Sequence, residues 1–479
     1  MKSILILPFF IFLEGSTIAQ TKATEEIVEL HQKMKQHLDS GLLFLENRQQ
    51  QETISGRHYI GEWPSFMGLK RRFVLLGKDD PVYDSNCYSV AQIHNSLANI
   101  YLKYPEYKRI LPMLELSFQR ILGYRNGQLF NFWNLLPPLK KLHRSDSLWP
   151  NELVRRPTNF RLKSKYINKA ANVAEDADDT ALAYMALALR KKIDSSNIEY
   201  TELFSPSVSI LFDVYRDTGR KNRHWYNYLY GNDHNTGAYL TWLTKEHEFK
   251  HWNIITVIGH NATFFLPFSE CYPHAYVPYL PYGSNDLDAV VNSNVLSSIA
   301  MNGEIEIAQG VAHTIAYIEH KASSKKYDRV ATYYPNRYQF PYAASKAYAE
   351  GISSLTRSMR YFTEYLTQTQ NEDGSWFARK RVNKKDALQS TAYALNALIN
   401  IGDYEANNTI PAIHNALKYL FAHANHNEYG SHWQGGVYFT GGTVVRNTLY
   451  WKSNAYTTAI IIEAFANYSK YLELAYDLK

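Results

Sequence analysis

The sequence predicts an all-α protein, specifically an α/α toroid in which paired helices stand side by side in a closed ring. Three observations favour this fold class. Long segments have helical periodicity, whereas the alternation typical of strands is scarce. A short unit that joins a Leu, a turn and a Trp recurs along the chain. No linker rich in Pro, Gly or Ser divides the 479 residues, so we expect one toroid with insertions.

The helical pattern is clearest in three apolar runs that contain alanine. They are ALAYMALAL at 181–189, TAYALNAL at 391–398 and TTAIIIEAFA at 457–466. The segments between such runs carry the Gly, Asn, Asp and Pro residues that favour turns. The composition is 45% hydrophobic and 20% charged, which is ordinary for a globular protein, so the chain can bury a sizeable core around these helices.

The recurring unit consists of an aromatic–Leu pair at a helix end, a turn, and then a Trp. In the clearest copy, at 365–376, Gln370, Gly374 and Trp376 follow the pair. We expect the Gln to cap backbone groups and the Trp to pack on the turn, which is a structural role. Stacked helix pairs bury faces that one pair cannot bury alone. Less complete copies occupy 44–63 and 419–433, the latter with Ala424 in the Gln position.

An acidic cluster precedes the apolar run at 181–189. Asp176, Asp178 and Asp179 lie at the start of the expected helix. Like charges held close together cannot all ionise, so one proton would be retained at neutral pH. Asp residues are also common helix caps, and Asp176 or Asp178 could simply bind the first free N–H groups of the helix. The residues alone leave both interpretations open.

These two segments together resemble a known family. Residues 370–376 (QNEDGSW) resemble the core of the QW repeat of squalene and oxidosqualene cyclases, without the Lys/Arg-Gly pair that opens the repeat there. Residues 175–181 (EDADDTA) resemble the DxDDTA motif of class II terpene cyclases. The resemblance covers about 171–479 best. The chain is short for the two-toroid architecture of that family, which again implies a single toroid of the terpenoid-cyclase type.

The resemblance implies an isomerase that protonates a polyprenyl substrate and cyclises it. Asp178 matches the proton donor of the family, while Asp176 and Asp179 would hold the proton and stabilise the conjugate base. Aromatic faces would stabilise the carbocation. The acid starts the reaction, so no cofactor and no metal ion are expected. The expected ligand is an apolar isoprenoid or another small molecule.

Two polar segments are candidates for the lining of a central cavity. Residues 285–294 contain Asp286, Asp288 and Asn292, and the last two are at helical spacing. Tyr334 lies in an aromatic stretch that is typical of a cavity rim. The stretch at 285–294 is equally compatible with a capped, half-exposed helix, and the stretch with Tyr334 is compatible with ordinary turn material.

The first 19 residues have the pattern of a cleavable signal peptide. Lys2 precedes a short apolar run at 4–13, and Ala19 is a small residue at the expected cleavage site. This run is too short to span a bilayer. We therefore expect a signal peptide at 1–19, a toroid domain at 20–479, and a periplasmic or secreted protein.

The two cysteines exclude one relative of the toroid fold. Cys87 and Cys271 lie outside any Cys/His ligand pattern, which argues against a zinc protein prenyltransferase subunit. They could form one disulfide in an oxidising compartment or remain as two buried thiols.

Two other functions are compatible with the sequence. The chain could be a non-catalytic periplasmic toroid that binds a lipid, a glycan or a protein, or a toroid glycan hydrolase or lyase.

The net charge is +6 without a long basic run, so no nucleic-acid partner is expected. If the ligand is apolar, the protein could also associate with a membrane surface.

Overall fold

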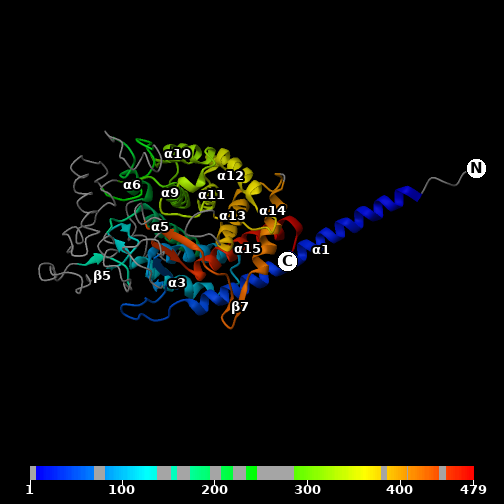
Figure 1. Ribbon diagram of the computed structural model, residues 1–479, viewed down its shortest axis with the longest axis horizontal. Helices are drawn as coiled ribbons and strands as arrows, with labels where there is room; N and C mark the ends of the chain where they lie inside the picture. The colour runs from blue at the N-terminus through cyan, green and yellow to red at the C-terminus, as the bar shows by residue number, and fades with distance from the viewer. Residues whose placement is uncertain are drawn as a thin grey trace, which may run out of the picture.

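A computed structural model describes most of the chain, namely residues 7–69, 81–136, 153–158, 173–194, 207–219, 233–244, 285–378, 386–406, 408–441 and 449–478. Within these ranges the chain is predominantly helical (Figure 1), so the all-α prediction is confirmed.

An inner set of helices forms a closed ring. In the described part of the chain, each inner helix packs against the next one along the sequence, and the last packs against the first. In chain order the inner helices are α2 (Cys87–Lys103), α5 (Ala177–Ile193), α9 (Ala289–Met301), α11 (Gln339–Ala349), α13 (Ala387–Ile401) and α15 (Asn454–Tyr476).

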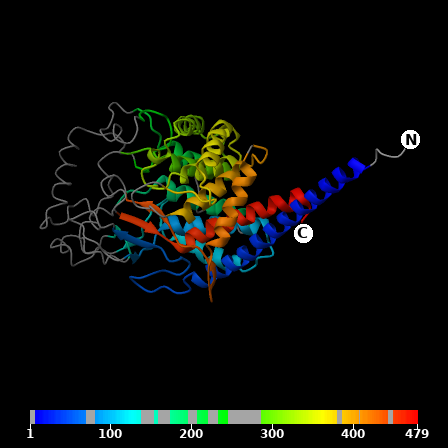
Figure 2. The same ribbon diagram turned by 45° about the vertical axis from the view of Figure 1, so that its right-hand side comes forward.

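A second set of helices surrounds this ring, as Figures 1 and 2 show. Outer and inner helices alternate along the chain, and outer helices contact the inner ring, for example α3 on α2 and α5, and α14 on α13. This alternation is the predicted α/α toroid. The outer helices are α1 (Leu7–Arg48), α3 (Ile110–Leu122), α6 (Val208–Asp213), α10 (Val311–Ser323), α12 (Thr356–Thr369) and α14 (Thr409–Ala422).

The sequence pattern explains which helices lie inside. In α5 every residue from Ala177 to Leu189 is buried, because neighbours surround this helix on all sides. In α12 the large buried apolar residues are Met359, Phe362 and Leu366, which lie on one face at helical spacing. A helix with a single apolar face packs on the outside of the ring and leaves its polar face to water.

A small antiparallel sheet lies where α2 and α15 begin. Its strand order is β2-β1-β10-β9, so it joins the strands before α2 to those before α15. Short runs such as FMGL and LYWK were not predicted as strands. The strands are β1 (Phe66–Leu69), β2 (Val82–Tyr83), β9 (Val437–Thr440) and β10 (Leu449–Lys452).

The remaining regular elements are short. Three two-stranded ribbons pair β3 with β4, β5 with β6, and β7 with β8. The elements are β3 (Arg125–Asn126), β4 (Leu129–Phe130), β5 (Leu135–Leu136), β6 (Val154–Arg155), β7 (Asn425–Asn427), β8 (Gly430–His432) and the 3₁₀ helices η6 (Tyr327–Arg329) and η7 (Ser353–Leu355).

The three copies of the Trp unit have the same geometry. In each copy the buried indole N–H donates to the carbonyl of the Leu in the preceding outer helix. The N···O distance is 3.0 Å from Trp376 to Leu366. The two other pairs, each at 2.8 Å, are Trp433 with Leu420 and Trp63 with Leu45.

Gln and Gly in these units attach the outer helix that ends there to another outer helix. Gln370 donates to the carbonyls of Gly374 at 3.0 Å and of Ala412, in α14, at 2.8 Å. Gly374 has a φ of +85°, and a Cβ there would lie 2.3 Å from the carbonyl oxygen of Asn415, so only glycine fits. Gly430 approaches Ser40 of α1 in the same way, which joins the last unit to the first outer helix.

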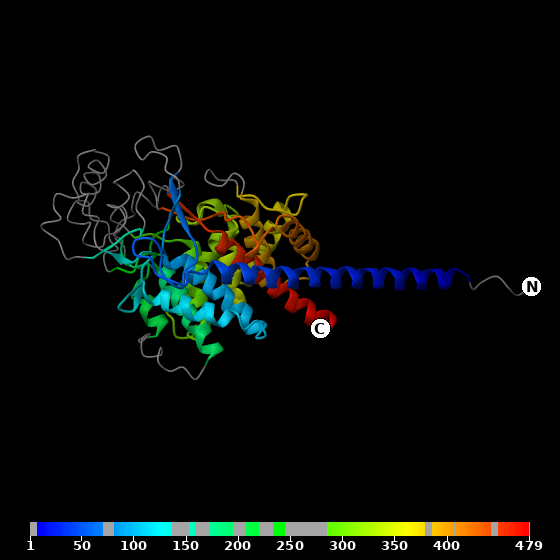
Figure 3. The same cartoon turned by 90° about the horizontal axis from the view of Figure 1, so that it is seen from below.

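The N-terminal part of the chain belongs to α1, which extends well away from the helical body (Figure 3). The predicted cleavage site after Ala19 lies within this helix, and export stays a prediction. Among the described residues, no helix combines the length and apolar content that a membrane span requires. Cys87 is a buried free thiol, while Cys271 lies outside the described residues.

Candidate active site

The acidic cluster lies at the N-terminus of the inner helix α5. Asp176 is the N-cap, with an extended backbone, and its carboxylate accepts the N–H of Asp179 at 2.8 Å. Thr180 accepts the N–H of Phe130 at 3.0 Å, just as Thr391 accepts the N–H of Trp376 at 3.1 Å. Asp176 therefore has the capping role, and the side chain of Asp178 is left for other contacts.

Asp178 is held by two side chains from distant parts of the sequence. Its Oδ1 accepts the amide N–H of Asn294, in α9, at 2.6 Å. Its Oδ2 accepts the hydroxyl of Tyr334, which precedes α11. Both carboxyl oxygens of Asp178 therefore accept a hydrogen bond from a side chain. Asp178 is 5% exposed, so water has little access to this carboxyl group.

Burial favours the protonated form of this acid. It raises the pKa of Asp178 well above its usual value, and the charges of Asp176 and Asp288 act in the same direction, while the Asn294 hydrogen bond opposes them. Burial also raises the pKa of Asp176, to about 6. The cluster can therefore retain a proton at neutral pH.

Asp179 is the most enclosed member of the cluster. Burial raises its pKa well above the usual value, and the neighbouring Asp176 and Asp178 add to the effect. Its Oδ1 is buried and has no hydrogen-bond partner among the described residues. The thiol of Cys87 lies next to this carboxyl group and hydrogen-bonds to it. With Asp178 and Asp179 both protonated, Asp176 would carry the only negative charge of the three.

Aromatic side chains surround the acid. The ring of Tyr334 lies 5.8 Å from those of Tyr88 and Phe439, measured between centroids. Tyr88 stacks on Tyr438 at 5.5 Å, and Phe439 stacks on Phe132 at 4.7 Å. β9 carries Tyr438 and Phe439, so the small sheet supplies aromatic faces beside α5. Such faces attract cations through their negative π-surfaces.

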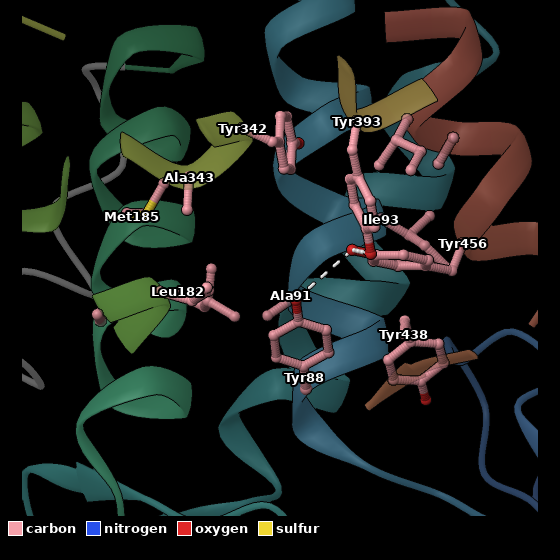
Figure 4. Close-up of a cluster of buried hydrophobic side chains, with 14 of the residues drawn as sticks. Tyr88, Ala91, Ile93, Leu182, Met185, Tyr342, Ala343, Tyr393, Tyr438 and Tyr456 are labelled. Atoms are coloured by element: carbon pink, nitrogen blue, oxygen red, sulfur yellow. Dashed lines mark hydrogen bonds between the residues drawn. The ribbon is translucent and has the colours of Figure 1, made fainter. Parts of the chain in front are cut away.

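A chain of tyrosine hydroxyls continues into the ring (Figure 4). Tyr393 and Tyr456 are joined at 2.8 Å between hydroxyl oxygens, and Tyr456 lies 3.5 Å from Tyr88. Gln339 donates to the Tyr88 hydroxyl at 2.8 Å. Figure 4 also shows Leu182, from α5, facing these rings. The interior is therefore mainly aromatic and aliphatic, and several of its tyrosine hydroxyls bind one another.

The predicted lining residues have different surroundings. Asp288 is the N-cap of α9, and its second oxygen accepts the N–H of Thr332 at 2.6 Å. Asn292 exchanges hydrogen bonds with the main chain of Tyr239, both at 2.9 Å. These two side chains thus connect backbone segments, which fits the capped-helix interpretation of the stretch, although the helix is buried.

The other two belong to a tyrosine pair beside the acid. Asp286 accepts the hydroxyl of Tyr333 at 2.8 Å, and Tyr333 is the neighbour of Tyr334, which binds Asp178 directly. Asn294 lies inside the stretch at 285–294 but was not singled out by the sequence, because its partner is 116 positions away. Among the described residues no group of His, Cys, Asp and Glu could hold a metal ion.

The toroid is similar to several solved structures. No protein-family model and no curated protein matches the sequence. The type II terpene cyclase MstE from Scytonema, with merosterolic acid A as product, is 11% identical; the match covers 92% of this chain and 99% of that one, with a TM-score of 0.53. Another MstE structure holds geranylgeranyl dihydroxybenzoate as substrate.

Cellobiose 2-epimerase from Spirochaeta thermophila is 12% identical, over 95% of this chain and 99% of that one, with a TM-score of 0.53. A protein from Actinoplanes is also 12% identical, over 91% and 99%, with a TM-score of 0.52. Identities this low concern the fold alone. The chain has the α/α-toroid fold of the class II terpene cyclases, which it also shares with a sugar epimerase.

Proposed function

We propose that this protein is a class II terpene cyclase-like isomerase in which Asp178 protonates a polyprenyl substrate. The observation that carries the proposal is the position of Asp178. It is a buried acid with a raised pKa, held by Asn294 and Tyr334 beside the aromatic interior of the ring. A structural cap would not need this arrangement, because Asp176 already caps α5.

The proposed reaction is an isomerisation. The carboxyl group of Asp178 gives its proton to one carbon of a terminal alkene, or to the oxygen of an epoxide, and the positive charge passes to a substrate carbon. Internal double bonds then attack that carbon in turn and form rings. Loss of a proton from the final cation restores an alkene, so substrate and product have the same atoms.

The surrounding residues would stabilise the charges that develop. After the transfer, the N–H of Asn294 and the hydroxyl of Tyr334 would donate to the new carboxylate, and hydrogen bonds to an ionised group are stronger than neutral ones. The rings of Tyr88 and Phe439 would face the cation. Burial of the site would exclude water, which otherwise would capture the cation.

The test is Asp178→Asn, assayed with squalene and prenyl substrates and read by mass spectrometry. Loss of a general acid costs on the order of 10²–10⁴ in rate, and protonation of an alkene places the loss at the upper end. Asp386→Asn is the matched control. Asp386 is the buried N-cap of another inner helix, α13, and Asn caps a helix about as well as Asp.

The proposal requires a folded, inactive Asp178→Asn and an active Asp386→Asn. Conversion that survives Asp178→Asn would show that the acid lies elsewhere. If the wild type converts none of these substrates and a lipid or glycan co-purifies with it, the non-catalytic binding function is supported instead.

A toroid that acts on a glycan is the second candidate. Cellobiose 2-epimerase and the cyclase MstE match this chain with the same TM-score. The fold alone therefore supports a glycan substrate as well as it supports a polyprenyl one. Incubation with cello-oligosaccharides tests it, and new sugar products from the wild type would support it. The buried aromatic surroundings of Asp178 favour the apolar substrate.

A further inference from the structure

Asp84 is a buried carboxyl group that binds two tryptophans. It directly follows strand β2 and is 0% exposed. Its Oδ2 accepts the indole N–H of Trp451 at 2.7 Å and that of Trp133 at 3.0 Å, and its Oδ1 accepts the main-chain N–H of Thr158 at 3.2 Å. Indole and main-chain nitrogens can only donate, so all three contacts suit a carboxylate.

The ionised form of Asp84 is held by neutral groups. Burial, with a smaller effect from the charge of Glu62, raises its pKa to about 6, and the three N–H groups oppose this rise. Within the described ranges no Lys, Arg or His is among the groups that act on this carboxyl group. At neutral pH Asp84 is therefore mostly a buried anion whose charge is not neutralised by a neighbouring cation.

Other buried indoles of this fold bind neutral acceptors. Those of the three Trp units donate to main-chain carbonyls. Trp242 donates to the hydroxyl of Tyr333 at 3.2 Å. A neutral acceptor would thus satisfy the indoles of Trp133 and Trp451 as well, without the burial of a charge, which is costly. What the carboxylate adds at this place is its negative charge.

The two indoles lie 6.0 Å apart and form an aromatic box with two phenylalanine rings. Both meet Phe132 at 5.3 Å, edge to face in each case. Trp451 meets Phe439, its partner across the β9–β10 pair, in the same way at 5.3 Å. The box consists of Phe132, Trp133, Phe439 and Trp451. Asp84 thus fixes the indoles that support both phenylalanines.

Phe439 joins the box to the candidate acid. Its ring lies 5.8 Å from that of Tyr334, whose hydroxyl donates to Asp178. Phe439 is half-buried, whereas the other three members of the box are buried. It is therefore the member of the box that a ligand beside Asp178 can touch.

A buried anion behind aromatic rings favours a cation in front of them. The faces of such rings already attract cations. Hydrogen bonds to a carboxylate increase the electron density of the indoles, and the charge itself is little screened where water is excluded. A field arranged in advance stabilises a charge that develops during a reaction, because no group has to reorient.

We propose that Asp84 is a positioning residue that orients Trp133 and Trp451 and makes the aromatic box a site for a cationic group beside Asp178. Its occupant is the carbocation that forms when Asp178 gives up its proton, so the inference rests on the proposed function. A stable isoprenoid ammonium can stand in for this cation. The site can therefore be tested without turnover.

The experiment compares farnesyltrimethylammonium with its neutral isostere, in which carbon replaces nitrogen, as ligands of the full chain. The ratio of the two dissociation constants measures the preference for charge, because both ligands have the same apolar tail. The proteins are the wild type, Asp84→Asn, Trp451→Phe and Asp217→Asn. Asp217 is the matched control, since it is also 0% exposed and its carboxylate binds the N–H and the hydroxyl of Thr236.

We expect the wild type to bind the ammonium about tenfold more tightly than the isostere, or better. An asparagine oxygen can still accept both indoles, so Asp84→Asn removes the charge and keeps the rings in place. The preference should then fall by about tenfold, with unchanged affinity for the isostere. Trp451→Phe keeps a ring but loses the N–H that binds Asp84, so the preference should fall as well. Asp217→Asn should behave like the wild type.

With a substrate that turns over, Asp84→Asn should lower kcat by about tenfold and leave KM nearly unchanged, because the charge acts on the cation and not on the neutral substrate. A merely structural role would lower the melting temperature and leave the preference for charge as it is. If Asp84→Asn does not fold, the preference of Trp451→Phe decides between the two roles.

A wild type that binds both ligands equally would overturn the inference. So would an Asp84→Asn protein that keeps the preference, or an Asp217→Asn protein that loses as much of it. The cyclase proposal is judged separately. A preference that depends on Asp84, without conversion of any prenyl substrate, refutes catalysis alone. Cyclisation by Asp178 with a preference that neither Asp84→Asn nor Trp451→Phe changes refutes the role of Asp84 alone.

Discussion

The three carboxyl groups at the start of α5 differ in their partners, and this difference separates their roles. Asp176 accepts a main-chain N–H of its own helix, as any N-cap does. Asp178 instead binds two side chains, from α9 and from the segment before α11. Asp176 and Asp178 are close in the sequence but have different surroundings. Asp176 is therefore a structural cap, and Asp178 is the candidate acid.

Stability should depend on pH through these buried acids. Burial raises the pKa of Asp386 to about 7, while an Asp in the unfolded chain has a pKa of about 3.9. Between these values the native protein keeps a proton that the unfolded chain has lost, so stability falls as the pH rises from about 4 to 7. Asp386→Asn removes this effect.

The melting temperature of Asp386→Asn minus that of the wild type should therefore become larger as the pH rises through that range. Asp178→Asn should show the same sign, starting from about pH 4, because burial also raises the pKa of Asp178. Thermal unfolding of the three proteins at several pH values measures this. A difference that shrinks with increasing pH would mean that these carboxyl groups are ionised in the native state.

Sequence reasoning could single out Asp178, and Tyr334 as a possible lining residue, but not Asn294 and not the contacts that join these residues. The spacing of three acids before an apolar helix is a local pattern. Asn294 and Tyr334 are 116 and 156 positions away, and nothing near them in the sequence indicates that the ring brings them to the acid.

At the scale of elements, the Trp units are joints between neighbouring outer helices. Each indole binds the helix that ends, and each Gly lies against the helix that follows. The sequence predicted the Leu, turn and Trp of each unit because they are close in the chain, but not the contact with the following helix, such as that of Gln370 with Ala412. It did not predict the β1–β10 pairing, since Phe66 and Lys452 come from opposite ends of the chain.

Trp376→Ala should lower the free energy of unfolding by about 3–5 kcal/mol, since the side chain is fully buried and its removal leaves a cavity. Denaturant unfolding measures the change. Phe377→Ala is the matched control, because the neighbouring ring is 41% exposed and should cost much less. Equal losses for the two variants would show that Trp376 does not anchor the joint.

The whole molecule is a ring with a long N-terminal helix that extends from it. The apolar run at 4–13 and the small residue Ala19 are the basis for export, which no structural observation tests. We expect the exported protein to begin near Gln20. N-terminal sequencing of protein recovered from outside the cytoplasm checks this, and an exported form that still carries Met1 would contradict it.

The ring is closed by the two ends of the chain, because α15 packs on α1 and α2, and Gly430 lies against Ser40. Contacts between such distant positions form slowly, since a long loop must close before they contribute any stability. An emerging chain therefore has no closed ring until α15 has been synthesised. If the protein is exported, as the pattern of its first 19 residues predicts, this delay would help, because a chain without a closed ring passes through a membrane more easily than a folded one.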